Sequence, residues 1–218
     1  MFFRRLALFS TFVLAACSSS LQGVGDAVGL LRATRGNQQV DATQLNPRYR
    51  YLRVSVHGRS TLLVLGYVDP DRHGPVEVWY SGSGEVLRLQ NGRLVGAAGL
   101  TVDWSNVHFS AYPHWSDIAS PLTLTRSRDV MPGYAYGVTD TLQLRPIAPP
   151  ARTDLADLRS NALQWYEEDA RGLRPARYAV MREAGETVVV YGEQCLSNNF
   201  CLSWQRWPAH AMGQSDAR

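Results

Sequence analysis

The feature that most constrains the fold is an alternation of apolar and polar residues between Tyr49 and Ile147. It recurs in short stretches, of which residues 51–56, 87–90 and 142–145 are examples. Because successive side chains of a β-strand point to opposite faces, a period of two indicates strands with one buried and one solvated face. Such strands are typical of antiparallel sheets. The chain is therefore expected to contain roughly eight or more strands, arranged as a sandwich or a barrel.

Residues with strong turn preferences separate these stretches. The run from Ser81 to Gly84 predicts a connection between two strands, and Asn91 with Gly92 predicts a type I′ hairpin. The segment 61–68 is more continuously apolar, which favours a central position in the sheet. Gly66 within it indicates a bulge or a close approach of another group to the backbone.

A helix is expected after the alternating region, which ends at Pro149 and Pro150. Thr153 or Asp154 can cap its start, and Gly172 can follow its end. Five apolar residues fall on one helical face, namely Leu155, Leu158, Ala162, Trp165 and Tyr166. The acidic run Glu167-Glu168-Asp169 would then be a solvated helix end, or would pair with the arginines of a partner.

The rest of the chain returns to strands. Two are expected at residues 178–182 and 187–191, joined at 184–185, and a last one at 200–207. The predicted fold class is therefore mainly β, an antiparallel β-sandwich or barrel-like sheet with one helix in the C-terminal third.

The first seventeen residues have the layout of a bacterial secretory signal. Arg4 and Arg5 precede a short apolar run, and the run closes with Leu14-Ala15-Ala16-Cys17. These four residues resemble the lipobox of lipoprotein signals, after which the cysteine is acylated, for example with palmitate. Residues 1–16 are thus the expected signal peptide and Cys17 the expected lipidation site.

The lipid anchor also predicts a location. Several acyl chains bury far more methylene groups than the single chain that binds a bilayer only marginally. In the lipoprotein sorting rule, Asp after the cysteine retains the product at the inner membrane, and Ser18 stands there instead. We therefore expect an outer-membrane lipoprotein that faces the periplasm. A free soluble protein with a cleaved signal is the alternative, whereas the apolar run is shorter than the ~20 residues of a membrane-spanning helix.

Composition divides the mature chain into three parts. Residues 17–46 are expected to be a lipidated tether, either a loose amphipathic helix or a flexible linker. Residues 47–210 are expected to form a single β-rich periplasmic domain, and 211–218 a disordered tail. The formal charge of +3 includes Arg4 and Arg5, which leave with the signal, so the mature charge is +3 − 2 = +1. No basic run is present, so nucleic acid is not an expected partner.

The cysteine count supports export. If Cys17 carries lipid, Cys195 and Cys201 remain of the three cysteines, and they can pair in an oxidising periplasm. Closing this small loop stabilises the fold by roughly 2 to 2.5 kcal/mol in the chain-entropy view. Their spacing fits no common zinc or thioredoxin-type pattern, so a structural disulfide is expected.

No catalytic, cofactor or metal site can be assigned from the motifs. The sequence has no G-x-S-x-G nucleophile motif, no G-x-G-x-x-G and no Walker-type phosphate loop. His108 and His114, with Asp103 and Asp117 nearby, lack a standard ligand spacing and are interpreted as a polar loop. The segment 61–68 is followed by Asp69, Asp71 and His73. Two carboxylates and an imidazole can take part in acid–base catalysis or bind calcium. Simple turn chemistry is the favoured interpretation.

Aromatic residues gather in the strand-rich half. They are Trp79, Tyr80, Trp104, Tyr112, Trp115, Tyr134 and Tyr136. Aromatic faces stack on sugar rings, but aromatic side chains also fill β cores. Trp104, Tyr112 and Trp115 are the best candidates for glycan contact because their segment has the character of a loop.

Several segments together resemble the YjbF/GfcB capsule lipoprotein family. The matching runs begin at Tyr49 (YRYLRV), Leu63 (LVLGYVD), Glu77 (EVWYS) and Leu87 (LRLQNGRLVG), and they follow a lipobox. The resemblance covers about residues 45 to 110. It weakens towards the C-terminus, where Phe200-Cys201-Leu202-Ser203-Trp204 departs from the expected ending.

The resemblance implies a periplasm-facing outer-membrane lipoprotein. Such proteins are encoded with exopolysaccharide or group 4 capsule export components, including a large outer-membrane protein, and the family has no established catalytic residues. We therefore expect a non-enzymatic accessory in polysaccharide secretion, which docks on the exporter and can also contact the glycan. The alternatives are a polysaccharide-modifying enzyme and a purely structural envelope lipoprotein.

Overall fold

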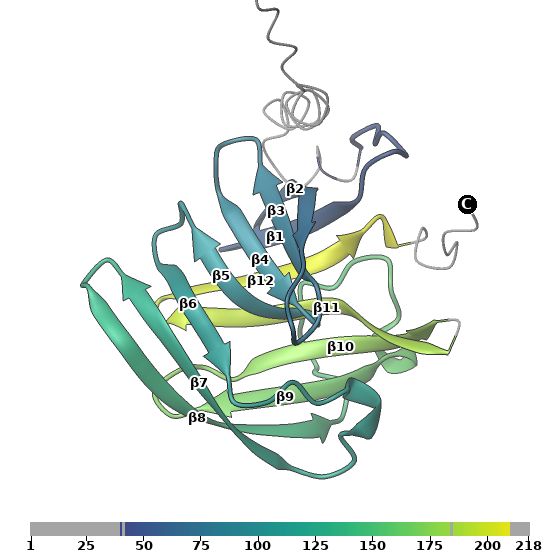
Figure 1. Cartoon of the computed structure of the whole chain (residues 1–218). Helices are drawn as coiled ribbons and strands as arrows, with labels where there is room; N and C mark the ends of the chain where they lie inside the picture. The colour runs from purple at the N-terminus through teal and green to yellow at the C-terminus, as the bar shows by residue number, and fades with distance from the viewer. Residues whose placement is uncertain (1–39, 41, 184, 210–218) are drawn as a thin grey trace, which may run out of the picture.

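The structure, a computed structural model, describes residues 40, 42–183 and 185–209. In this part of the chain twelve antiparallel strands form one closed barrel (Figure 1), in which consecutive strands are neighbours and β12 pairs with β1. The strands are β1 (Tyr51–Val56), β2 (Arg59–Asp69), β3 (Val76–Ser81), β4 (Val86–Gln90), β5 (Arg93–Ala98), β6 (Asp103–Phe109), β7 (Leu122–Met131), β8 (Ala135–Ile147), β9 (Gln164–Ala170), β10 (Ala176–Glu183), β11 (Glu186–Ser197) and β12 (Phe200–Trp207). The predicted mainly β fold with a barrel-like antiparallel sheet is confirmed.

The alternation in the sequence becomes the inside and outside of the barrel. In β1, Leu52 and Val54 belong to the large buried core, whereas Tyr51 belongs to a separate cluster on the outer face. In β12, Leu202 and Trp204 point inwards in the same way. Burying one face of each strand removes its apolar surface from water, which stabilises the ring by roughly 25 cal/mol for every Å² buried.

Two smaller apolar clusters lie outside the barrel wall. One joins Val40 to the outward side of β1 and β2, and it includes Trp207. The other lies where the β8–β9 connection, residues 148–163, packs Leu163 against Trp165 and Tyr191. Part of the outer face is therefore covered by the chain's own connections.

Connections alternate between the two ends of the barrel because every pair of neighbours is antiparallel. The end at which β1 begins and β12 ends, here called the terminal end, also carries the connections 70–75, 91–92, 110–121, 148–163 and 184–185. The opposite end, here called the hairpin end, carries the connections 57–58, 82–85, 99–102, 132–134, 171–175 and 198–199. All connections of the hairpin end are short, so it consists of tight turns.

The predicted turns are confirmed. Asn91 and Gly92 join β4 to β5 with φ of 50° and 76°, as a type I′ hairpin requires. Ser81 ends β3, and its hydroxyl accepts backbone N–H bonds from residues 83, 84 and 85. At Gly66 the β2–β3 register shifts, and a Cβ there would lie 2.6 Å from the Tyr80 ring. Gly66 therefore marks both a bulge and a close approach.

The predicted helix in the C-terminal third is wrong. Residues 148–163 form an irregular connection with one short 3₁₀ turn, η2 (Ser160–Ala162), and β9 follows. Trp165 and Tyr166, placed on one helical face by the sequence pattern, point to opposite sides of β9, Trp165 outwards and Tyr166 into the core. The helical spacing arises because the connection packs its leucines on the outer wall. A strand at this position is required to bridge β8 and β10 and close the ring.

The predicted disulfide is confirmed. Cys195 of β11 and Cys201 of β12 are bonded, and they are directly paired in the register, with Cα atoms 3.8 Å apart. The signal peptide, Cys17, most of the expected tether and the expected tail 211–218 lie outside the described residues. Within the described part of the chain, no helix has the length and apolarity needed to cross a membrane.

Candidate functional site

The residues that stand out in the sequence converge on one cleft of about 690 Å³, here called the seam cleft. It follows the junction of β5 and β6, where the described register contains a single pair, Ala97 opposite Trp104. Five residues considered separately in the sequence line it: Asp71, His73, Trp104, His108 and Tyr112. The segment that carries Trp104, Tyr112 and Trp115 thus contains β6 and then a loop, from which Tyr112 reaches His73 of the β2–β3 connection.

The rim of the seam cleft combines an aromatic pair with an ionised carboxylate. The rings of His73 and Tyr112 are stacked, with centroids 4.8 Å apart. The Asp71 carboxylate accepts hydrogen bonds from the His73 backbone N–H at 2.8 Å and from the Gln90 amide at 2.9 Å. These bonds lower the pKa of Asp71. The rim therefore presents a carboxylate in its acceptor form beside the stacked rings.

Trp104 forms part of the floor, and it lies on β6 rather than on a loop as expected. Its ring is buried, and its indole N–H donates to the Leu196 carbonyl oxygen at 3.0 Å. The guanidinium carbons of Arg126 and Arg128 lie 4.6 and 4.5 Å from its ring centroid. The ring is therefore already engaged by cations of the protein.

Trp115 has a structural position at the terminal end. It opens the short 3₁₀ helix η1 (Trp115–Asp117), is buried, and donates its indole N–H to the Asn91 carbonyl oxygen at 2.9 Å. Glycan contact by Trp104, Tyr112 and Trp115 stays a prediction. Tyr112, which is partly exposed, is the member of the set that a ligand in the seam cleft meets first.

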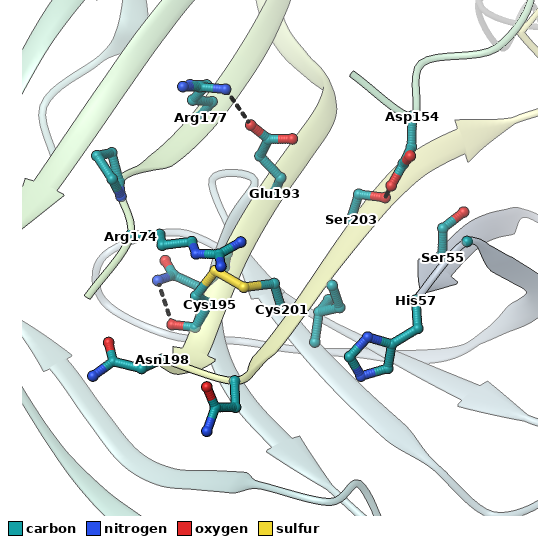
Figure 2. A pocket seen from close by; sticks show the side chains of 15 residues that line it. Ser55, His57, Asp154, Arg174, Arg177, Glu193, Cys195, Asn198, Cys201 and Ser203 are labelled. Atoms are coloured by element: carbon teal, nitrogen blue, oxygen red, sulfur yellow. Dashed lines mark hydrogen bonds and ion pairs between the residues drawn. A yellow bond between two sulfur atoms is a disulfide. The ribbon is translucent and has the colours of Figure 1, made fainter. Parts of the chain in front are cut away.

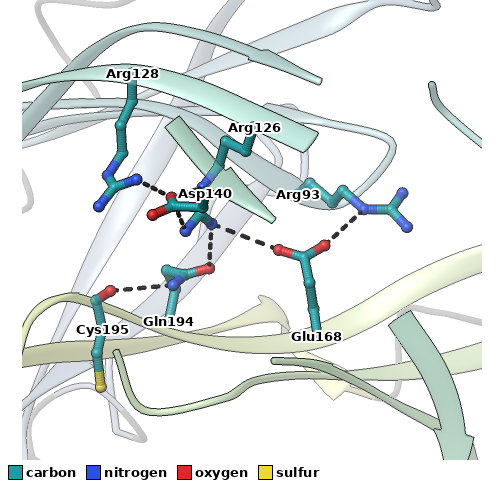
Figure 3. Close-up of polar contacts among 7 residues, drawn as sticks. All are labelled: Arg93, Arg126, Arg128, Asp140, Glu168, Gln194 and Cys195. Carbon is teal, nitrogen blue, oxygen red and sulfur yellow. Dashed lines mark hydrogen bonds and ion pairs between the residues drawn. The ribbon is translucent and has the colours of Figure 1, made fainter. Parts of the chain in front are cut away.

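A cluster of buried charges lies inside the barrel (Figure 3), and two of its arginines are the ones that contact the Trp104 ring. Arg126 donates to Asp140 at 2.8 Å and lies 3.5 Å from a Glu168 oxygen, and Arg128 also pairs with Asp140. On the other side of Glu168, Arg93 donates its Nε–H at 3.3 Å. The side chains of Arg93 and Glu168 have no solvent exposure.

The cluster contains one more cation than anion, three guanidinium groups against two carboxylates. Both terminal nitrogens of Arg93 are buried without a hydrogen-bond partner among the described residues. Its guanidinium carbon lies 4.0 Å from the centroid of the Trp115 ring, and the π face partly replaces the missing acceptor. Burial, with the charge of Arg126, lowers the pKa of Arg128 to about 10. Because the side chains are buried and each arginine contacts a carboxylate, we interpret the cluster as part of the core.

This cluster corrects the prediction for the acidic run at 167–169. Glu168 is neither a solvated helix end nor a partner-binding group, because it pairs with two arginines of its own chain. Its neighbour Glu167 points outwards and binds Arg145 and Arg177. A signal was present in the sequence: Arg126 follows Leu122 and Leu124 at a spacing of two, so the inward face of one strand changes from leucine to arginine.

The carboxylates among the remaining sequence candidates have local partners. Asp69 pairs with Arg88 at 2.8 Å, and Asp103 accepts the backbone N–H groups of residues 99 and 100. Asp117 accepts a hydrogen bond from Ser116, and His114 precedes η1. Among the described residues, no three His, Cys, Asp or Glu side chains are grouped closely enough to hold a metal ion.

Comparison with known proteins gives a fold relationship. No protein-family model and no curated protein sequence matches the chain. A solved structure, that of the hypothetical lipoprotein YmcC from Escherichia coli (K12), is similar in fold, with a TM-score of 0.51. The match covers 84% of this chain and 94% of that one, at 16% sequence identity. At this identity the similarity shows a shared fold.

Proposed function

We propose that the chain is an outer-membrane lipoprotein, anchored through Cys17 and facing the periplasm. The observation that carries this proposal is the sequence from Arg4 to Cys17, which has a basic start, a short apolar run and a lipobox-like end. The protein of similar fold is itself described as a lipoprotein, which agrees with the proposal. Ser18, in the position where Asp would cause retention, favours the outer membrane.

The anchored barrel acts as a non-enzymatic accessory in the secretion or assembly of a capsule or exopolysaccharide. The resemblance of residues 45 to 110 to the YjbF/GfcB family supports this role. The seam cleft supports a binding function, because it offers the partly exposed ring of Tyr112 beside the carboxylate of Asp71, which is fixed by two hydrogen bonds. The protein docks on an outer-membrane export protein, and Tyr112 contacts the polysaccharide.

The anchor is tested by substitution at the lipobox. Cys17→Ala should abolish incorporation of a radiolabelled palmitate precursor and move the protein to the soluble periplasmic fraction. Ser18→Ala keeps the cysteine and serves as the matched control, with unchanged labelling and location. Ser18→Asp should retain the labelled protein at the inner membrane in a density gradient. Membrane association of Cys17→Ala would refute the anchoring mechanism.

The secretion role is tested in cells. Deletion of the gene should lower the amount of polysaccharide outside the cell, and the wild-type chain should restore it while Cys17→Ala should not. Crosslinking in intact cells, followed by mass spectrometry, should recover an export component. Unchanged secretion together with the absence of any export component would favour a structural envelope lipoprotein, and release of sugar by the purified protein would favour an enzyme.

A further inference from the structure

A second cleft, of about 700 Å³, lies at the hairpin end and is here called the hairpin cleft (Figure 2). Three connections that neighbour one another around the barrel form its rim: 57–58, 198–199 and 171–175. Its floor is the outer face of β11 and β12, where the Cys195–Cys201 disulfide ties the two strands together. The side chains that line it are mostly polar.

The rim carries exposed polar side chains that make no described hydrogen bond within the protein. His57, Arg174, Asn198 and Asn199 are exposed, and none of them has a hydrogen-bond or ion-pair partner among the described residues. The described contact of His57 is an edge contact of its ring with Phe200. Each of the three rim connections thus supplies at least one free planar group that can donate to or accept from a ligand.

The floor, in contrast, is fixed by internal bonds. Glu193 accepts a hydrogen bond from Arg177 at 3.1 Å and another from the Tyr191 hydroxyl at 2.9 Å. At the other side, Ser203 donates to the Asp154 carboxylate at 2.8 Å, and Figure 2 shows both pairs beside the disulfide. A floor held in this way places its remaining acceptor positions in advance, which lowers the cost of ordering them on binding.

His57 adds an independent observation. It has φ of 50°, and Gly58 after it has φ of 73°, nearly the backbone of Asn91 and Gly92 at the terminal end. Asn is strongly preferred at the first position of such a turn, and His is among the other residues that adopt a positive φ. The turn therefore accepts His57 but does not require it, and its imidazole lies on the rim of the cleft.

We propose that the hairpin cleft binds a neutral saccharide. Planar amide, guanidinium, imidazole and carboxylate groups pair with the neighbouring hydroxyls of a sugar ring, which donate and accept at once. The charges facing the cleft balance, since Arg177 is paired with Glu193, and the free Arg174 is offset by Asp154. This balance favours an uncharged ligand over a phosphate or a carboxylate.

The inference deepens the proposed function, on which it rests for the source of the saccharide. The cleft lies at the end of the barrel opposite to the one at which β1 begins and β12 ends.

The experiment uses the full lipidated chain, purified in a detergent without a sugar headgroup. The chain is applied to an array of neutral hexose oligosaccharides, and the strongest binder is titrated by calorimetry beside trigalacturonic acid and inorganic phosphate. We expect a neutral oligosaccharide to bind, and Arg174→Ala and Asn198→Ala each to weaken it about tenfold, the effect of one lost hydrogen bond. Arg48→Ala and Asn161→Ala, which change exposed residues of the same types outside the cleft, should leave the affinity unchanged.

Other outcomes overturn the inference. They are a silent array, equal or tighter binding of trigalacturonic acid or phosphate, and loss of binding in Tyr112→Ala but not in Arg174→Ala, which would place the ligand in the seam cleft. The proposed function fails separately, since it depends on secretion in cells. If the purified chain binds a neutral oligosaccharide but deletion of its gene leaves secretion unchanged, the binding site is supported and the role in secretion is refuted.

Discussion

Two hairpins of the barrel share one backbone shape and differ in everything around it. Asn91 and Gly92 turn at the terminal end with φ of 50° and 76°, and His57 and Gly58 turn at the hairpin end with φ of 50° and 73°. The Asn91 amide donates to the His73 carbonyl oxygen, and its own carbonyl oxygen accepts the Trp115 indole N–H. His57 has no such bond among the described residues.

The difference extends beyond the two turns. At the terminal end the connection 110–121 folds over the barrel, and Trp115 fills the space between Tyr166, Tyr178 and Arg93. Around the hairpin cleft the connections are short and their polar side chains face solvent. The polar groups around Trp115 and Asn91 therefore stabilise the fold, whereas those on the rim of the hairpin cleft remain available to a ligand.

The largest effect is expected for Trp115→Ala. It removes a buried indole and uncovers the Arg93 guanidinium, so it should lower the free energy of unfolding by about 3–5 kcal/mol. The counterpart at the hairpin end is Asn198→Ala, which should change it by about 0.5 kcal/mol or less. Urea denaturation followed by far-UV circular dichroism measures both. Similar costs for the two variants would break the contrast between the ends.

The two turn glycines give a second and smaller contrast. Both have positive φ, so replacement with Ala costs about 1–2 kcal/mol at either site. A Cβ at Gly92 would also lie 2.3 Å from the Cβ of Val189, whereas a Cβ at Gly58 would meet nothing within 4 Å. Gly92→Ala should therefore cost about 1–3 kcal/mol more than Gly58→Ala. Equal midpoints in urea for the two variants would show that the terminal end is less closely packed than described.

The backbone features predicted from sequence depend on local chemistry. The hairpin at Asn91, the bulge at Gly66 and strands such as β1 and β12 are predicted from turn preferences and the period of two. All of them are confirmed. The helix is the exception. Leu155, Leu158 and Trp165 have a helical spacing, but they pack on the outer wall of the barrel. The strand β9 is needed to close the ring of strands, and no local sequence pattern shows that need.

The candidate sites were less accessible to prediction, because they depend on which strands become neighbours. Asp71, His73 and Tyr112 were recognised one by one, but the sequence does not show that they line one cleft. Glu168 looked solvated because it lies among charged residues, and only the barrel places it between Arg93 and Arg126. The rim of the hairpin cleft joins residues from 57 to 199, a distance along the chain that no motif spans.

The pH dependence of stability should have opposite signs at the two ends. Hydrogen bonds lower the pKa of Asp71 from 3.8, so its contribution is present above pH 3.8 and is lost as the pH falls through its folded-state value. Burial raises the pKa of Glu193 from 4.5, so its contribution is fully present below pH 4.5 and is lost as the pH rises through its folded-state value. Relative to Asp71→Asn, the wild-type chain should gain stability with rising pH, and relative to Glu193→Gln it should lose it. Urea titrations at a series of pH values measure both differences, and slopes of the same sign would contradict the assignment.

The smallest effect is expected from exchanging the first residues of the two hairpins, and it tests the comparison most directly. His57→Asn places the preferred residue at the first position of the turn, where the side chain has no structural bond, so it should raise the free energy of unfolding by a few tenths of a kcal/mol. Asn91→His removes the preferred residue and the hydrogen bond to the His73 carbonyl oxygen, so it should lower the free energy of unfolding by about 1 kcal/mol. If the imidazole serves a ligand, His57→Asn should also weaken binding of the neutral oligosaccharide while it stabilises the protein. If His57→Asn is more stable and binds the oligosaccharide as well as the wild-type chain does, the imidazole does not contribute to binding.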